Sequence, residues 1–194
     1  MSTAAIATDE TDPPMRPLPG RAAELLAGVD ASPRLVAHLR AVHDVAAQLV
    51  EWVELRCPAL EFDVEAVLFG AATHDIGKAL HPAELSGPGA RHEEAGRELL
   101  LGHGVEPDLA RFAGTHASWA APGVGAEDLL VSLADKIWKN KRVTELEDLI
   151  VALLAGADGR AAWEWFMELD EVLTEIGDGA DRRLAYQMSH SLTG

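Results

Sequence analysis

The chain carries eight histidines in 194 residues, and several stand at helical spacing from apolar residues. His43 lies four residues after Leu39 and three before Ala46, which places it beside the apolar stripe of a predicted helix. Asp75 extends another predicted apolar stripe, with His74 directly before it. The full set of polar residues predicted to face inward is His43, His74, Asp75, His92, His116 and Asp135. Imidazole and carboxylate groups gathered in this way are typical ligands of transition metals.

The two aspartates make a purely structural role for this set unfavourable. A lone inward-facing histidine is usually a hydrogen-bonded core residue. A buried carboxylate, however, costs several kcal/mol unless a positive charge is paired with it. Nitrogen and oxygen ligands suit Mn, Fe, Co, Ni or Zn, and six ligands suffice for two ions that share one carboxylate. The sequence therefore predicts a multi-histidine site that binds divalent transition-metal ions as cofactors, with enough ligands for two.

The segment AATHDIGK at residues 71–78 resembles the signature of the HD-domain metal-dependent phosphohydrolases. The resemblance covers about residues 30–145 and keeps the order of the family's ligands. The family's series His…His-Asp…Asp is matched by His43, His74-Asp75 and Asp135. Two further histidines of its small binuclear members are matched by His92 and His116. The resemblance implies an all-α fold and a hydrolytic activity.

The resemblance also implies how these residues share two ions. The four residues of the series would hold one ion, and Asp75 would bridge to a second ion held by the two further histidines. A water or hydroxide between the ions would be the nucleophile that attacks phosphorus. Asp75 and Lys78 are the residues expected to act in catalysis, because Lys78 matches the lysine of the HDxxK variant of the motif.

The four lysines of the chain fall in two short segments, HDIGK and DKIWKNKR. A solvated surface usually scatters its lysines, so this clustering indicates a local role in binding an anion; chance is the alternative. Lys139 can also be explained as a solvated cation at a helix C-terminus. The residues expected to contact a phosphorylated substrate are Lys78, Lys136, Lys141 and Arg142.

Three functions remain open at this point. The first is a metal-dependent phosphohydrolase that cleaves a phosphoester or phosphoanhydride bond of a small, nucleotide-like substrate. The second is an oxygenase with a mixed-valence di-iron centre, because some HD-domain proteins use the same four-histidine, two-aspartate set for that purpose. The third is a non-catalytic sensor of metal or nucleotide, which the complete ligand set argues against.

Charge and composition restrict the partners and the compartment. Thirty-two acidic residues against sixteen basic ones give a net charge of −16, which disfavours nucleic-acid polymers and anionic membranes as partners. Cys57 is the single cysteine, so no internal disulfide forms and zinc sites of several thiolates are excluded. The N-terminus has no secretory pattern, and we expect a cytoplasmic protein. The oligomeric state stays open, with a homodimer as the assembly considered.

The elements that must position these residues are predicted to be helices throughout. The pattern favours an all-α fold, a compact bundle of about seven to nine helices, and the resemblance implies that this is an HD-domain bundle. Residues 1–17 are predicted to be a disordered tail, and residues 18–194 a single domain with a helical extension from about residue 156. Helices are predicted from Ser32-Pro33 to about Arg56, after Asp63, over 91–102, 107–118 and 126–140, from Thr144, and on both sides of Gly179. Residues 77–90 and 119–125 are predicted loops.

Overall fold

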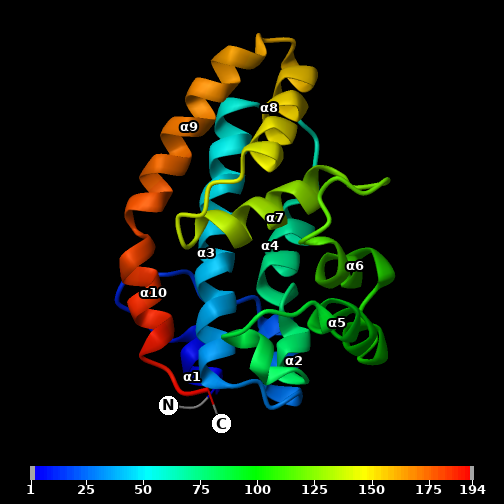
Figure 1. Ribbon diagram of the computed structural model, residues 1–194, viewed down its shortest axis with the longest axis vertical. Helices are drawn as coiled ribbons and strands as arrows, with labels where there is room; N and C mark the ends of the chain where they lie inside the picture. Colours follow the sequence, from blue (N-terminus) through cyan, green and yellow to red (C-terminus); the bar gives the residue numbers. More distant parts are fainter. Residues whose placement is uncertain (1–2, 193–194) are drawn as a thin grey trace.

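The computed structural model describes residues 3–192, and this part of the chain is built from helices without a strand (Figure 1). The α-helices are α1 (Thr3–Thr8), α2 (Gly20–Gly28), α3 (Pro33–Arg56), α4 (Val64–Thr73), α5 (Arg91–Gly102), α6 (Pro107–Thr115), α7 (Ala126–Ile137), α8 (Thr144–Asp158), α9 (Ala162–Asp178) and α10 (Ala180–Met188). Two short 3₁₀ helices, η1 (Ile76–Ala79) and η2 (Pro82–Leu85), lie between α4 and α5. The predicted all-α class is confirmed. Within the described residues, no helix combines the length and apolar character needed to cross a membrane.

The long helix α3 runs through the middle of the bundle, and α1, α4, α7 and α10 all contact it (Figure 1). Its start follows from a local signal, because Ser32 Oγ accepts a hydrogen bond from the Leu35 N–H at 3.3 Å and Pro33 fills the first helical position. From Leu35 to Ala47 every residue of α3 is buried. A helix covered on all sides offers each of its faces to a neighbour, so polar residues on any face can contribute to an internal site.

Two apolar clusters hold the helices in place. The first packs α3 and α4 against α7, α8 and α9, with Trp165 fully buried in it. The second packs the beginning of α3 against α1, α2, α5 and α6. Burial of apolar side chains is the main favourable contribution to folding. The helix ends that carry the polar residues described below are therefore held in a fixed arrangement.

The N-terminal segment is ordered from Thr3 onward, so the predicted disorder of residues 3–17 is corrected; residues 1–2 lie outside the described part. Ile6 in α1 is 1% exposed and Met15 is 8% exposed. The guanidinium of the buried Arg40 donates hydrogen bonds to the carbonyl oxygens of Ile6 at 2.7 Å, Met15 at 2.9 Å and Arg16 at 3.0 Å. A buried cation with three backbone acceptors fixes a segment whose own composition is too polar to order itself.

The loops follow the prediction with one difference. Residues 119–125 contain no helix, as expected. Residues 77–90 include η2 and most of η1. The chain after α8 continues as α9 and α10, and Gly159 ends α8 in the left-handed conformation with φ 76°.

Candidate metal centre

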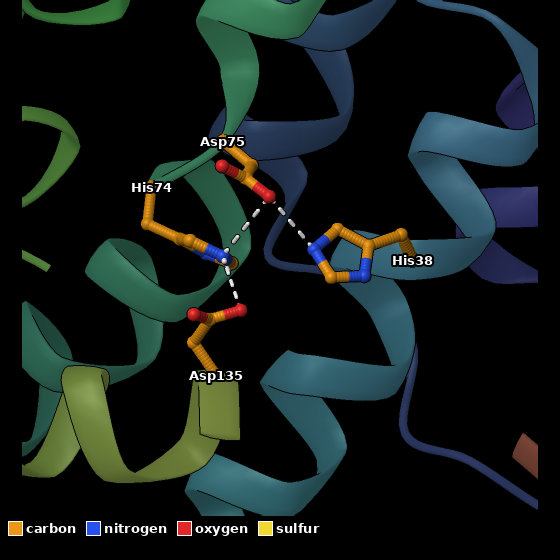
Figure 2. A group of neighbouring side chains, drawn as sticks. All are labelled: His38, His74, Asp75 and Asp135. Atoms are coloured by element: carbon orange, nitrogen blue, oxygen red, sulfur yellow. Dashed lines mark hydrogen bonds and ion pairs between the residues drawn. The ribbon is translucent and has the colours of Figure 1, made fainter. Parts of the chain in front are cut away.

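Four buried side chains from separate helix ends and faces meet inside the bundle (Figure 2). His38 comes from α3, His74 directly follows α4, Asp75 directly precedes η1, and Asp135 lies in the last turn of α7. One ligand atom from each of the four lies within 4.8 Å of the others. This is a spacing at which a single cation can contact all four.

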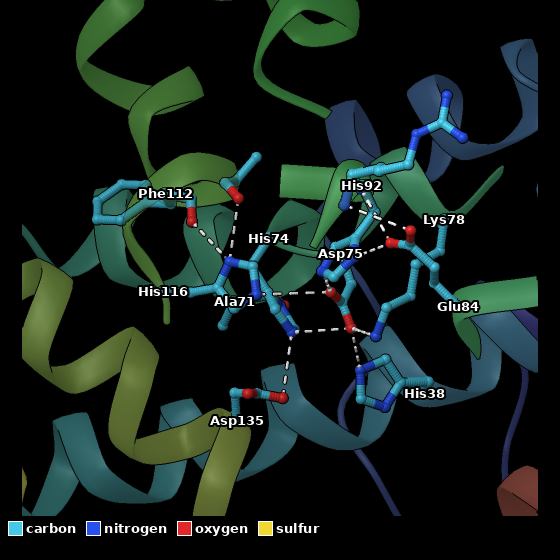
Figure 3. A network of polar contacts seen from close by, with 12 residues as sticks. His38, Ala71, His74, Asp75, Lys78, Glu84, His92, Phe112, His116 and Asp135 are labelled. Carbon is cyan, nitrogen blue, oxygen red and sulfur yellow. Dashed lines mark hydrogen bonds and ion pairs between the residues drawn. The ribbon is translucent and has the colours of Figure 1, made fainter. Parts of the chain in front are cut away.

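A second group shares Asp75 with the first (Figure 3). His92 from the first turn of α5 and His116 from the end of α6 place their Nε2 atoms 3.0 Å and 3.6 Å from Asp75 Oδ1. On the other oxygen, Asp75 Oδ2 lies 2.9 Å from His38 Nε2 and 3.5 Å from His74 Nε2. One carboxylate therefore stands between four imidazoles, with two of them on each oxygen.

Three of the four imidazoles are held in the orientation and tautomer that metal binding requires. A carbonyl oxygen can only accept, so His74 Nδ1–H donates to Ala71 O at 2.9 Å, and His116 Nδ1–H donates to Ala113 O at 3.1 Å. His92 Nδ1–H donates to the carboxylate of Glu84 at 2.6 Å. In each ring the remaining nitrogen, Nε2, faces Asp75. Partners of this kind are the usual supports of metal-ligating histidines.

The buried ligand atoms do not satisfy one another by hydrogen bonds, but a cation would satisfy them. In a neutral ring with Nδ1 protonated, Nε2 carries a lone pair, and here such lone pairs face carboxylate oxygens. His74 Nε2, His92 Nε2 and Asp75 Oδ1 are all buried and have no hydrogen-bond partner. Buried polar atoms normally have one. A divalent cation would satisfy all three, because each of them can donate an electron pair to it.

Without a cation, the carboxylates draw a proton onto His74, whose Nε2–H then faces them in the place that a metal ion would take. Burial by itself lowers the pKa of His74, but the charges of Asp75 and Asp135 outweigh it and raise that pKa to about 9. Burial likewise acts to raise the pKa of Asp75, but the charge of His74 and the hydrogen bond with His38 hold that pKa well below its usual range. The two carboxylates thus demand positive charge at the point where the ligand atoms meet.

Glu84, which sequence reasoning missed, anchors the loop between α4 and α5 to the site. Besides His92 Nδ1–H, its carboxylate accepts the backbone N–H of His92 at 3.0 Å and that of Arg91 at 3.3 Å. It therefore caps the start of α5 and orients a ligand at the same time. Its position in a glycine-rich loop carried no periodic signal. The length of that loop was the only indication of a role for it.

The close packing around Gly77 explains why a glycine follows the His-Asp pair at this position. A Cβ atom at this position would overlap the carbonyl oxygen of His92 and lie 2.6 Å from the backbone nitrogen of Gly96. Only a residue without a side chain lets η1 and α5 approach this closely. The close approach brings His92 within reach of Asp75, so the glycine of the HDIGK segment serves the geometry of the second group.

Two of the predicted substrate-binding cations lie directly on the carboxylates of the site. Lys78 Nζ lies 2.6 Å from Asp75 Oδ2, and the ammonium group of Lys136 pairs with Asp135. Lys136 Nζ also lies 5.5 Å from the centre of the Trp119 ring. Both lysine side chains are largely buried, and they add positive charge beside the ligand atoms.

The other two predicted substrate contacts are not at the site, and the expectation is corrected. The guanidinium of Arg142 forms a two-pronged pair with Glu147 at 2.9 Å and 2.7 Å and also contacts Asp170 at 2.9 Å. These contacts connect the start of α8 to α9, and they occupy the hydrogen-bond donors of the Arg142 guanidinium. Lys141 is exposed, and among the described residues its side chain contacts none of the ligand atoms.

His43 is also not part of either group, and His38 takes the place that was predicted for it. The two residues are five positions apart on α3, which turns them about 140° from each other around the helix axis. His43 is 5% exposed and lies near Asp44, Arg16 and Arg40 rather than Asp75. The apolar stripe used for the prediction was misleading, because α3 is buried on all sides and its other faces also point inward.

His43 is expected to make the folded protein sensitive to acid. Burial disfavours its charged ring and lowers its pKa to about 4, whereas an unfolded histidine titrates near 6.5. The unfolded state therefore takes up the proton first, and the stabilising contribution is lost as the pH falls from about 6.5 to about 4. Relative to its value at pH 8, the free energy of unfolding of the wild type should fall at pH 4 by on the order of 3 kcal/mol more than that of His43→Gln.

Urea unfolding of both metal-free proteins between pH 4 and pH 8 measures this difference. His43→Gln changes the stability at every pH, so the test is the slope with pH and not the value at one pH. Parallel profiles would show that His43 does not titrate in this range.

Comparison with known proteins gives one match. The family model of the HD domain matches residues 35–154, which include His38, His74, Asp75, His92, His116 and Asp135. This stretch begins in α3 and ends within α8. No curated protein and no solved structure matches the chain.

Proposed function

Because this chain belongs to the HD-domain family of metal-dependent hydrolases, we propose that it is a phosphohydrolase that cleaves a P–O bond of a small phosphorylated substrate. The observation that carries the proposal is the pair of buried groups joined at Asp75, with an ammonium group on each carboxylate. The ligand atoms fit metal ions, and the lysines fit an anionic substrate. A nucleotide-like substrate remains the expectation from the resemblance alone.

The two groups define which residues would hold metal. His38, His74, Asp75 and Asp135 would hold one divalent cation, and Asp75, His92 and His116 a second. Bound cations of this kind lower the pKa of a coordinated water and neutralise charge on phosphoryl oxygens. Asp75, which belongs to both groups, would hold the two metal sites in a fixed position relative to each other.

The remaining contributions come from side chains of the chain itself. Ala71, Ala113 and Glu84 fix three imidazole rings so that their Nε2 atoms stay turned towards Asp75. Lys78 and Lys136 place two positive charges at the edge of the site in a protein whose net charge is −16. Such local charge is needed because the overall field of the protein repels anions. These lysines would bind and orient the phosphoryl group.

Metal analysis and a phosphatase screen of the same preparation test the proposal. The protein as purified should contain divalent metal. After chelation and reloading with Mn²⁺, Co²⁺, Ni²⁺ or Zn²⁺, it should release inorganic phosphate from at least one member of a panel of small phosphoesters, nucleotides and dinucleoside polyphosphates. Reloaded protein that releases no phosphate from any of them would contradict the proposed activity. Bound iron with oxygen-dependent turnover would instead support the oxygenase.

A further inference from the structure

A small pocket opens beside His38, on the side of the metal centre that faces α10. His38 and Lys78 line it from the centre itself, Trp138 and Lys139 from the chain after α7, and Leu184 and Gln187 from α10. Its volume is about 200 Å³. Since two of its lining residues also contact Asp75, a molecule bound in this pocket would lie next to the proposed reaction centre.

We propose that this pocket, called here the lysine pocket, binds the substrate, and that it selects phosphorylated compounds smaller than a nucleotide. The proposal rests on the proposed phosphohydrolase function and narrows its substrate class. Lys139 would bind a phosphate oxygen together with Lys78, and Leu184 and Gln187 would contact the organic part.

The charge of the lining supports an anionic ligand. Two of the residues that line the pocket are lysines and none is acidic, although acidic residues outnumber basic ones two to one in the chain. Lys139 Nζ also lies 5.7 Å from the centre of the Trp138 ring, which places the ammonium group at the wall of the pocket.

The size of the pocket limits the organic part. Sites for drug-sized ligands usually enclose about 300–1,000 Å³, and the lysine pocket is smaller. A phosphate with a short polar chain fits this volume, whereas a nucleoside would have to lie outside it. Gln187 offers both a donor and an acceptor, which suits hydroxyl groups on such a chain.

The wall formed by α10 is firmly attached and lies outside the residues that the family model matches. Arg183, directly before Leu184, is 6% exposed and donates to Trp138 O at 2.8 Å and to Ile176 O at 2.6 Å. It therefore links α10 to the residue that forms the opposite wall. The family match ends at residue 154, so Leu184 and Gln187 belong to a segment outside it. Specificity would thus come from the C-terminal extension, and the metal ligands from the shared domain.

Binding of inorganic phosphate to the metal-loaded protein tests the pocket without any turnover. Calorimetry should show about tenfold weaker binding for Lys139→Met, the usual effect of losing one charged contact. The matched control is Arg182→Met, which removes one positive charge from an exposed position of α10 outside the pocket, and its phosphate affinity should stay within about twofold of wild type. Metal content and unfolding temperature of both variants are measured to show that they fold.

Substrate ranking tests the size limit. Wild type should have a higher kcat/KM for glycerol phosphate than for nucleoside monophosphates, and Leu184→Ala, which widens the pocket, should shift the ratio towards the nucleotides. Unchanged phosphate affinity in Lys139→Met, or a wild type that prefers nucleotides, would overturn the inference while leaving hydrolysis intact. Loss of phosphate binding in Lys139→Met together with no turnover of any substrate would support the pocket and contradict the proposed activity.

Discussion

Asp75→Asn is expected to remove bound metal from both groups and to lower hydrolysis by more than about a hundredfold. The Asp75 carboxylate is the only side chain that belongs to both groups among the described residues, and its two oxygens face four imidazoles. An amide keeps the shape but not the charge, and its NH₂ group cannot bind a cation. Loss of a residue that merely supports a ligand costs about 10–100-fold, so loss of a shared ligand should cost more.

Elemental analysis and thermal unfolding with and without chelator measure this effect together. Metal that binds only the folded state stabilises it, by about 2.7 kcal/mol at a free concentration of 100 Kd. Chelator should therefore lower the Tm of wild type and leave the Tm of Asp75→Asn unchanged. A Tm of wild type that does not respond to chelator would count against metal at this position.

The chain supplies a matched control in its second His-Asp dipeptide, His43-Asp44. Asp44 is also buried, at 8% exposure, but it accepts hydrogen bonds from the backbone N–H of Arg16 at 3.0 Å and from Gln48 at 2.8 Å. Asp44→Asn should retain metal and a chelator-dependent Tm, and should change only the stability. A loss of metal in both variants would mean that general unfolding, and not ligation, explains the result for Asp75→Asn.

Features that depend on neighbours in the sequence were predictable. The start of α3 at Pro33 follows from the capping hydroxyl of Ser32, and the predicted helix over residues 91–102 agrees with the bounds of α5. Five of the six predicted ligands, those other than His43, lie in the two groups. In each of these five, helical spacing or the His-Asp motif indicated the inward face directly. Local signals of this kind predict the structure correctly because the tertiary packing favours the same conformation.

Features that depend on distant partners were not predictable from the same patterns. Order in residues 3–17 depends on Arg40, which lies more than 20 residues further along the chain. The role of Arg142 depends on Asp170, which is 28 residues away. In both cases the sequence shows a charged residue that could equally be solvated. Only the fold shows that its donors are already occupied.

His38 differs from these cases, because a signal for it was present. Leu35, His38, Val42 and Val45 follow one another at spacings of three, four and three, which places His38 on one face with three apolar residues. All three of those residues are fully buried or nearly so. Two apolar faces on one helix indicate a central helix, and the histidine on either face then becomes a candidate ligand.

The pair of variants His38→Ala and His43→Ala separates the two candidates. His38→Ala removes a ligand atom from the group that also contains His74, Asp75 and Asp135 but leaves the group of Asp75, His92 and His116 complete. Metal content should therefore fall from two ions per chain to one. Hydrolysis should fall by more than about a hundredfold, because both ions are needed to stabilise an in-line displacement.

His43→Ala should show the opposite pattern. Its ring is buried but contacts neither group, so metal content should stay at two ions per chain and kcat/KM within about twofold of wild type. The cavity left in the helix packing should lower the free energy of unfolding by about 2 kcal/mol or more. Elemental analysis, phosphate release and urea unfolding of the two variants in parallel give all three quantities. Loss of metal in His43→Ala with full metal content in His38→Ala would restore His43 as the ligand and contradict the arrangement around Asp75.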